Sequence, residues 1–184
     1  MARARGVDIR KVGSGNIGAT NVFRILGRPA GITVLLSDAL KGFIAARFIS
    51  FASDPSLVEY HGIVAGMAAI LGHNYTCWLR FKGGKGIATS AGVMLALVPL
   101  GLAIALSVWI VIFFLSKYVS LASIAAAIVL PLGVWLTGGT RRMIILTSVV
   151  SALAIYKHKG NIQRLMNGTE NRFGKKPRGK EDVL

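Results

Sequence analysis

Two glycine-rich segments of this sequence combine bare backbone with positive charge, the chemistry that binds phosphate. In the first, residues 80–89 read RFKGGKGIAT, so that three glycines frame Lys85 and two further cations precede it. Backbone amides unobstructed by side chains, next to fixed positive charge and the start of a helix, form an anion site. A nucleotide-hydrolysing P-loop is excluded, because Leu79 and Gly86 stand where that motif needs glycine and a hydroxyl residue. A basic membrane loop without a ligand is the alternative interpretation.

The second segment, residues 12–24, reads VGSGNIGATNVFR. Its hydrogen-bonding side chains and its guanidinium are those of Ser14, Asn16, Thr20, Asn21 and Arg24. This set suits a phosphate or a polyol. The glycine spacing also matches a dinucleotide-binding fingerprint, but no strand precedes it and no βαβ unit follows, so we reject that reading.

Two more polar segments interrupt the apolar sequence. Residues 156–172 read YKHKGNIQRLMNGTENR, and on a helix His158 and Asn161 would share one face. Arg164 and Glu170 follow in the same segment. A basic helix lying beside the membrane is the alternative here. Residues 117–123 read KYVSLAS and add two hydroxyl groups, those of Ser120 and Ser123.

The composition indicates an integral membrane protein. Hydrophobic residues make up 53% of the 184 residues, which is too many for an ordinary soluble domain. The formal net charge of +15 lies at the ends and in short loops, as expected for a membrane protein facing anionic headgroups. Nucleic-acid binding is the rival explanation, and it fails because long apolar runs separate the basic clusters.

The apolar runs predict helices over residues 31–53, 57–77, 121–138 and 142–158, and a longer run over residues 87–116. As one helix this longer run would measure about 45 Å, against a bilayer core of roughly 30 Å. It is either one tilted helix or two helices that turn near Pro99. The turn places nearly every basic cluster on one side of the membrane and only Arg141 and Arg142 on the other. The positive-inside bias therefore favours the turn. The first of the two helices must then be shielded by its neighbours. We therefore predict an all-α, polytopic transmembrane bundle with six spans, and four polar segments at one membrane face.

Some residues allow two interpretations. Asp38 and Lys41 share a helix face and form either a structural ion pair or part of a polar cavity. His73 is either a structural residue at a helix end or a catalytic one. Cys77 has no cysteine or histidine partners at metal-ligand spacing, and we expect no metal site and no cofactor. The tryptophans, expected at interfaces or in packing, are Trp78, Trp109 and Trp135.

Taken together, GSGNIGATNVFR, GHNY followed by FKGGKGIAT, YVSLAS and YKHKGNIQRLMNGTE resemble the signature segments of the PlsY family. These bacterial membrane acyltransferases use acyl phosphate to acylate sn-glycerol 3-phosphate. The resemblance implies a seven-helix protein of the bacterial inner membrane with its active site at the cytoplasmic face. The family's first helix would precede Met1, leaving six spans here. It also implies 1-acyl-glycerol 3-phosphate (lysophosphatidate) and phosphate as products, no cofactor and no nucleic-acid partner. We expect a monomer.

By the same resemblance, His158, Ser14 and Lys85 are the catalytic residues. The implied substrate-binding residues are Asn16, Thr20, Asn21, Arg24, Lys82, Gly83, Gly84, Gly86, Ser120, Ser123, Asn161, Arg164 and Glu170. Either His158 or a substrate phosphate oxygen would accept the proton. We expect one domain over residues 1–172 and a disordered basic tail over residues 173–184. The alternative function is a transporter subunit for an organic phosphate anion, which would use similar cations but place them at the membrane midplane.

Overall fold

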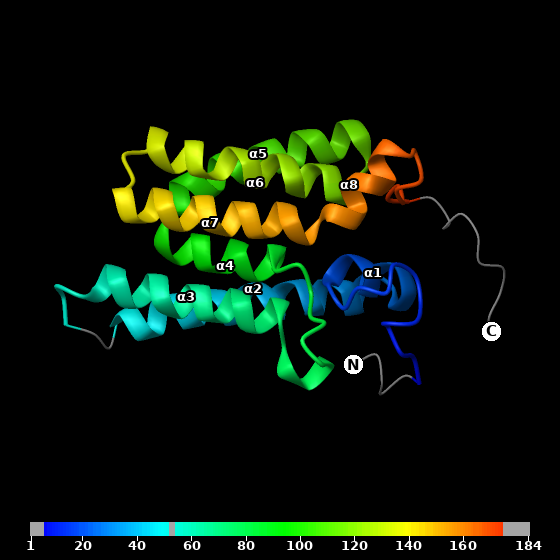
Figure 1. Cartoon of the computed structure of the whole chain (residues 1–184), viewed down its shortest axis with the longest axis horizontal. Helices are drawn as coiled ribbons and strands as arrows, with labels where there is room; N and C mark the ends of the chain where they lie inside the picture. The colour runs from blue at the N-terminus through cyan, green and yellow to red at the C-terminus, as the bar shows by residue number, and fades with distance from the viewer. Residues whose placement is uncertain (1–5, 52–53, 175–184) are drawn as a thin grey trace.

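The computed structural model describes residues 6–51 and 54–174, and within these ranges the regular structure is entirely helical. The helices are α1 (Ala19–Leu26), α2 (Arg28–Phe51), α3 (Val58–Asn74), η2 (Cys77–Leu79), α4 (Ile87–Leu97), α5 (Pro99–Ser116), α6 (Val119–Leu136), α7 (Arg141–Lys157) and α8 (Lys159–Met166). The six helices α2 to α7 lie along one common axis, with the chain reversing between them, and correspond to the six predicted spans (Figure 1).

By length and composition, three helical segments in the described ranges are able to cross a membrane: Arg28–Phe48, Pro99–Ser116 and Val119–Leu136. Helices α3 and α7 have 17 residues each, or about 26 Å at the usual rise of 1.5 Å per residue. The predicted all-α membrane bundle is confirmed, and the helix limits differ from prediction by a few residues at each end.

The apolar run over residues 87–116 is broken as the positive-inside bias favoured. Helix α4 ends at Leu97, and α5 begins at Pro99, which cannot donate the backbone hydrogen bond that a continuous helix would require there. The chain reverses at this point, and α5 runs back alongside α6 (Figure 1). The 11 residues of α4 measure only about 16 Å. Helices α2, α3, α5 and α7 pack around α4, so its short crossing is shielded by protein as expected.

Close backbone contact holds α4 against α2. A Cβ atom on Gly92 would overlap the carbonyl oxygen of Ala39, and one on Gly42 would overlap that of Thr89. Small residues permit such crossings where no water drives helices together. The adjoining apolar core includes Ile70, Val93, Met94, Val134 and Leu146.

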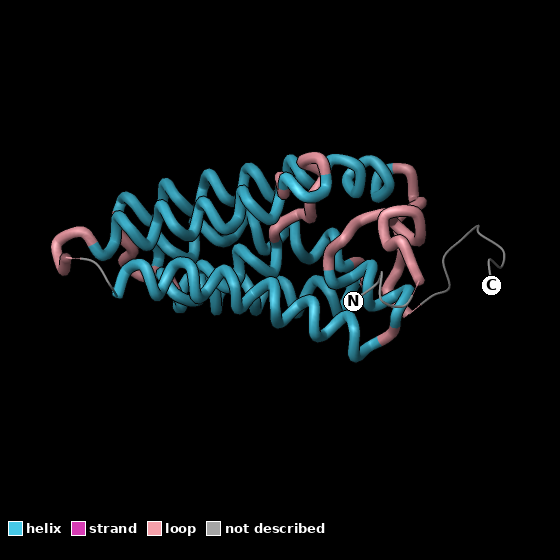
Figure 2. The backbone as a smooth tube through the Cα atoms, turned by 90° about the horizontal axis from the view of Figure 1, so that it is seen from below, coloured by secondary structure: helices cyan, strands magenta, loops and turns pink. Residues whose placement is uncertain are grey.

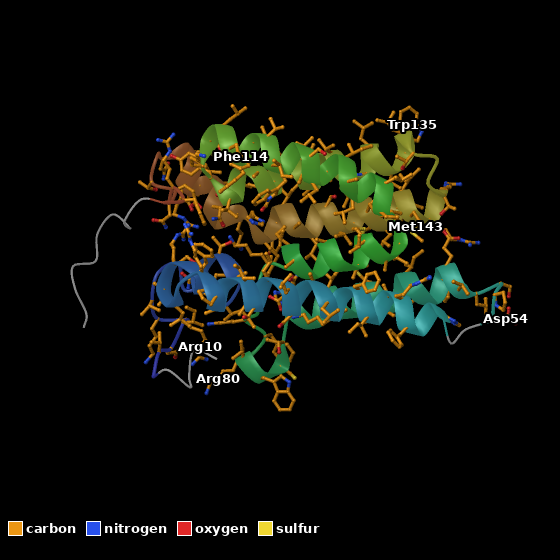
Figure 3. The ribbon with its side chains drawn as sticks, turned by 180° about the vertical axis from the view of Figure 1, so that it is seen from behind. Arg10, Asp54, Arg80, Phe114, Trp135 and Met143 are labelled. Atoms are coloured by element: carbon orange, nitrogen blue, oxygen red, sulfur yellow. The ribbon has the colours of Figure 1, made fainter. Side chains whose placement is uncertain are left out.

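The longer loops and the short helices α1 and α8 gather at one end of the bundle (Figure 2). Arg10 and Arg80 lie near this end and Asp54 at the other (Figure 3). At the far end Arg142 donates a hydrogen bond to Glu59 over 3.2 Å. The predicted arrangement, with the basic segments together and the pair Arg141–Arg142 opposite, is thus present.

Candidate active site

A cavity of 580 Å³ opens between the helices at the basic end. One part is lined by polar groups and the other by apolar side chains of α2, α5, α6 and α7. The predicted site residues in its lining are Ser14, Asn16, Thr20, Asn21, Arg24, Lys85, Gly86, Ser120, Ser123, His158, Asn161, Arg164 and Glu170. Segments far apart in the sequence therefore converge on one space.

The first glycine-rich segment is organised by Asn21, which is 1% exposed. Its amide group donates to the carbonyl oxygens of Ile9, Val12 and Asn16 over 2.9–3.2 Å, and its oxygen accepts from the backbone N–H of Ser14 over 2.9 Å. These bonds use the donor groups of the side chain and one acceptor position of its oxygen. Asn21 therefore shapes the loop that presents Ser14 and has no free donor for a substrate.

Lys85 reaches into the cavity from the loop that begins α4. Its ammonium group donates a hydrogen bond to Oδ1 of Asn161. The pKa of Lys85 is lowered to about 8, mainly by burial, with Glu170 raising it and the cations of Arg164 and Arg24 lowering it. A buried lysine among like charges is a group that gains stability when an anion binds.

Lys82, Gly83 and Gly84 lie outside the cavity lining. Lys82 is exposed to the surroundings, and the two glycines pack on the end of α3. The N–H of Gly83 donates to the carbonyl of Asn74, and that of Gly84 to the carbonyl of His73, both over 3.2 Å. Their N–H groups are thus committed to α3, and these glycines position the lysine loop from behind.

Glu170 connects the polar residues. One carboxylate oxygen accepts from Ser120 over 2.9 Å and from Asn161 over 2.8 Å, and the other accepts from Arg164 over 2.8 Å. Burial alone would raise the pKa of Glu170, but these three hydrogen bonds lower it. The carboxylate therefore stays ionised and holds groups of α6, α8 and, through Asn161, Lys85 in place.

His158 lies between α7 and α8 with 3% of its surface exposed. Its Nδ1 lies 2.8 Å from the carbonyl oxygen of Ala154, which can only accept, so Nδ1 carries the proton. Burial and the charge of Lys85 lower the pKa of His158 to about 4, against the effects of Ala154 and Glu170. The imidazole is therefore neutral at physiological pH, with Nε2 as a hydrogen-bond acceptor.

Lys157, the residue before His158, connects α7 to the end of α3. Its ammonium group donates to the carbonyl oxygen of Asn74 over 3.1 Å and lies 4.5 Å from the ring centre of Tyr75. The same carbonyl holds Gly83 of the lysine loop. Lys157 thus couples the position of His158 to that of the loop carrying Lys85.

Aromatic side chains form part of the cavity wall. Trp109, expected at an interface or in packing, lies in the lining and donates to Ser123 over 3.1 Å, while Ser123 donates to the carbonyl of Val119. Phe173 packs between Phe23 and Phe113, with ring centres 5.1 and 5.3 Å apart. Sequence reasoning missed Phe173, because it falls at the start of the tail predicted to be disordered. The rest of that tail, from residue 175, lies outside the described residues.

Asp38, Lys41 and His73 form a small polar cluster between α2 and α3. Lys41 lies 2.5 Å from Oδ1 of Asp38 and 2.8 Å from Nδ1 of His73. Asp38 and His73 also line the main cavity. Both interpretations of the Asp38–Lys41 pair therefore hold, and His73 is a helix-end residue at the cavity wall.

Two further observations concern ligands. The hydroxyl of Ser151, which lines the cavity, has no hydrogen-bond partner in the described part of the chain. Within residues 6–51 and 54–174, no group of three or more histidine, cysteine, aspartate or glutamate side chains could hold a metal ion.

An all-helical bundle with membrane-spanning segments, enclosing a pocket lined by cations and apolar side chains, defines an integral membrane protein with an internal ligand-sized site. The glycerol-3-phosphate acyltransferase family matches residues 1–168. The chain belongs to this family. It is 49% identical over 176 residues to the glycerol-3-phosphate acyltransferase of Geobacter sulfurreducens, covering 94% of this chain and 88% of that protein. The corresponding protein of Fusobacterium nucleatum subsp. nucleatum is 46% identical over 169 residues, covering 92% and 86%.

Solved structures agree. The crystal structure of PlsY, an integral membrane glycerol 3-phosphate acyltransferase, in its glycerol 3-phosphate form has a TM-score of 0.87 and 44% identity, covering 94% of this chain and 86% of that one. The lysophosphatidic acid form has a TM-score of 0.84 and 43% identity. The resemblance inferred from four short motifs is confirmed at the level of the family.

Proposed function

We propose that this protein transfers a fatty acyl group from acyl phosphate to the 1-hydroxyl of sn-glycerol 3-phosphate, giving 1-acyl-glycerol 3-phosphate and inorganic phosphate in phospholipid synthesis. The observation that carries the proposal is the two-part cavity, in which the cations Arg24, Lys85 and Arg164 adjoin a groove walled by apolar side chains. These three cations, beside a Glu170 carboxylate that accepts hydrogen bonds from the protein and an Asp38 carboxylate paired with Lys41, suit phosphate groups, and the groove suits an acyl chain.

The donor chemistry explains why no covalent intermediate is required. Acyl phosphate is a mixed anhydride with a good leaving group, so alignment of the two substrates suffices for reaction. The glycerol hydroxyl oxygen forms a bond to the carbonyl carbon, the bond from that carbon to the phosphate oxygen breaks, and the hydroxyl proton ends on the released phosphate. His158 can accept a hydrogen bond from the attacking hydroxyl at Nε2, or the phosphate oxygen takes the proton directly.

The cations of the site act on the negative charge of the substrate phosphates. Lys85 and Arg24 would bind phosphate oxygens and stabilise the charge that develops as the anhydride bond breaks. Ser14 would donate a hydrogen bond from its hydroxyl on the loop shaped by Asn21. Glu170 acts through its neighbours, since its carboxylate accepts three hydrogen bonds from the protein.

In the cell we place the protein as a monomer in the bacterial inner membrane with its cavity facing the cytoplasm. The basic loops at the cavity end support this orientation through the positive-inside bias. A single cysteine introduced at Gly13 or Asn167, in a Cys77→Ser background, should resist membrane-impermeant labelling from outside intact cells. Ready labelling of either position would contradict this orientation.

The reaction is tested with purified protein in proteoliposomes. Acyl phosphate and labelled glycerol 3-phosphate should give labelled lysophosphatidate, with rates unchanged by a chelator and with kinetics of a ternary complex. Acyl-CoA in place of acyl phosphate should give none. A strict requirement for acyl-CoA, an acyl group trapped on Cys77 or Ser14, or uptake of glycerol 3-phosphate into sealed vesicles without acylation would each overturn the proposal.

A further inference from the structure

The segment Thr76–Lys82 projects sideways from the bundle at the level where α3 ends (Figures 1 and 3). It is a compact turn. The backbone N–H groups of Leu79 and Phe81 donate to the carbonyl of Thr76 over 3.2 and 3.0 Å, and that of Lys82 donates to Leu79 over 3.1 Å. A fixed turn displays its side chains in a defined arrangement, unlike a loose loop.

This turn exposes two large aromatic side chains. Trp78 is 89% exposed and Phe81 is 66% exposed. Arg80 and Phe81 both adopt left-handed backbone conformations, with φ of 52° and 61°, which residues other than glycine rarely adopt. Such strained conformations cluster at ligand-binding segments. Because both aromatic side chains are largely exposed, a partner that covers them must lie outside the bundle.

The turn also carries positive charge without acidic partners. Arg80 and Lys82 are exposed, and neither forms an ion pair within the described residues. From Thr76 to Leu97 the chain contains no acidic residue. Alternating aromatic and basic side chains at the end of a membrane helix match the interface of a bilayer, where rings lie at headgroup depth and cations meet phosphate.

A second hollow, of 570 Å³, lies behind this turn between α2 and α3. Its apolar walls include Val34, Ala69, Leu79 and Trp78, and Lys41 lies in its lining. The side chain of Lys41 is 44% exposed. Asp38 and His73 also lie in this lining and hold the ammonium group of Lys41. The apolar walls, beside a basic aromatic turn, fit the first methylenes of a lipid whose headgroup lies at the turn.

We propose that the turn Thr76–Lys82 and the hollow behind it bind an anionic phospholipid of the surrounding leaflet. The headgroup phosphate contacts Arg80 and Lys82, while the lipid chains lie against Trp78 and the hollow walls. The turn itself lies outside the lining of the main cavity, whereas the hollow shares Asp38 and His73 with that lining. The inference does not depend on the proposed reaction. Because Gly83–Lys85 follows the turn directly, a lipid held here would also brace the loop that carries Lys85.

The test places the protein in nanodiscs, with Trp109→Phe and Trp135→Phe so that Trp78 reports alone. Brominated phosphatidylglycerol and brominated phosphatidylcholine are compared as quenchers of its fluorescence. We expect blue-shifted emission and several-fold stronger quenching by the anionic lipid. Replacing Arg80 and Lys82 by glutamine should reduce this preference by about five-fold for each charge removed, the effect of one cation at an anionic surface.

The matched control is Lys11→Gln with Lys159→Gln, which removes two exposed cations from the same end of the protein and should leave the preference unchanged. Native mass spectrometry of protein released from the discs should detect retained phosphatidylglycerol, and Ala69→Leu, which fills the hollow, should lose it while unfolding at a similar temperature. Equal quenching by both lipids would overturn the anionic-lipid assignment. Quenching by aqueous iodide as strong as that of free tryptophan, with none by lipid, would place the turn in water and overturn the whole proposal.

Discussion

Replacing Lys85 by alanine removes an ammonium group from the polar part of the cavity. The structure gives this group little packing role, because it follows two glycines and contacts Asn161 through a single hydrogen bond. Losing one charge-assisted contact to a phosphate costs about 1.5–3 kcal/mol, which corresponds to a roughly 10- to 150-fold lower kcat/KM. Lys85→Arg should also be impaired, because a planar guanidinium does not replace a point charge in a tight loop.

The pKa of Lys85 gives this prediction a second readout. With a pKa of about 8, the free enzyme carries the charge below pH 8 and loses it as the pH rises through 8. The kcat/KM for glycerol 3-phosphate should therefore fall above pH 8 in the wild type. Bound phosphate favours the charged form, so kcat at saturation should depend less on pH.

The assay is initial-rate acylation in proteoliposomes between pH 6 and 9.5. Lys85→Ala should be slow throughout and should lack the decline above pH 8, while Lys159→Ala, an exposed lysine near the same end, should match the wild type. An alanine variant with near-normal kcat/KM would refute the assigned role. One that retained the wild-type decline would show that another group titrates.

Three further predictions follow from the same network. Because the pKa of His158 is lowered to about 4, the imidazole stays neutral between pH 5 and 8, and its ring proton signals in NMR spectra should not shift over this range; a titration of the ring near pH 6.5 would contradict the buried, neutral form. Glu170→Gln should lower the Tm by about 4–8 °C, since hydrogen bonds to a charged group contribute roughly 2 kcal/mol, and an unchanged Tm would show that Glu170 does not hold the site together. Lys157→Met should raise KM for glycerol 3-phosphate by about ten-fold, but should raise it no further in a Lys85→Ala background. The control Lys159→Met should leave KM unchanged in both backgrounds. Additive losses would show that Lys157 acts independently of the lysine loop.

Much of the fold could be predicted because the bilayer constrains the length of each spanning helix and the side of the membrane on which each basic loop lies. The break at Pro99 followed from the excess length of the apolar run and from the charge distribution, since an unbroken helix would have sent the basic C-terminal segment to the other side of the membrane. Local patterns also placed the polar segments, because glycines, amides and cations rarely gather between apolar runs without a site to form. Neither argument needs knowledge of tertiary contacts.

What sequence reasoning missed depends on such contacts. Asn21 and Ser14 belong to one motif and both line the cavity. The amide group of Asn21 donates to backbone carbonyls, and only these contacts show that it is not a free donor for a substrate. Gly83 and Gly84 resemble a phosphate-binding backbone, but their N–H groups bond to the end of α3. Phe173 stands next to a basic, glycine-containing tail, and only its contacts with Phe23 and Phe113 reveal that the folded part extends to it.

The contact between Phe23 and Phe173 joins the beginning of the described chain to its end, and the cavity is built from both. Ser14 to Arg24 emerge from the ribosome before any of α2 to α7, whereas His158 to Phe173 emerge after all of them. A nascent chain can insert α2 to α6 in turn and still lack His158, Asn161, Arg164 and Glu170 of the cavity lining. Synthesis that stops after α6 would leave a well-inserted but inert protein. Conversely, two separately produced fragments divided between α4 and α5 would regain activity only when they assemble, which makes activity a direct report of completed folding.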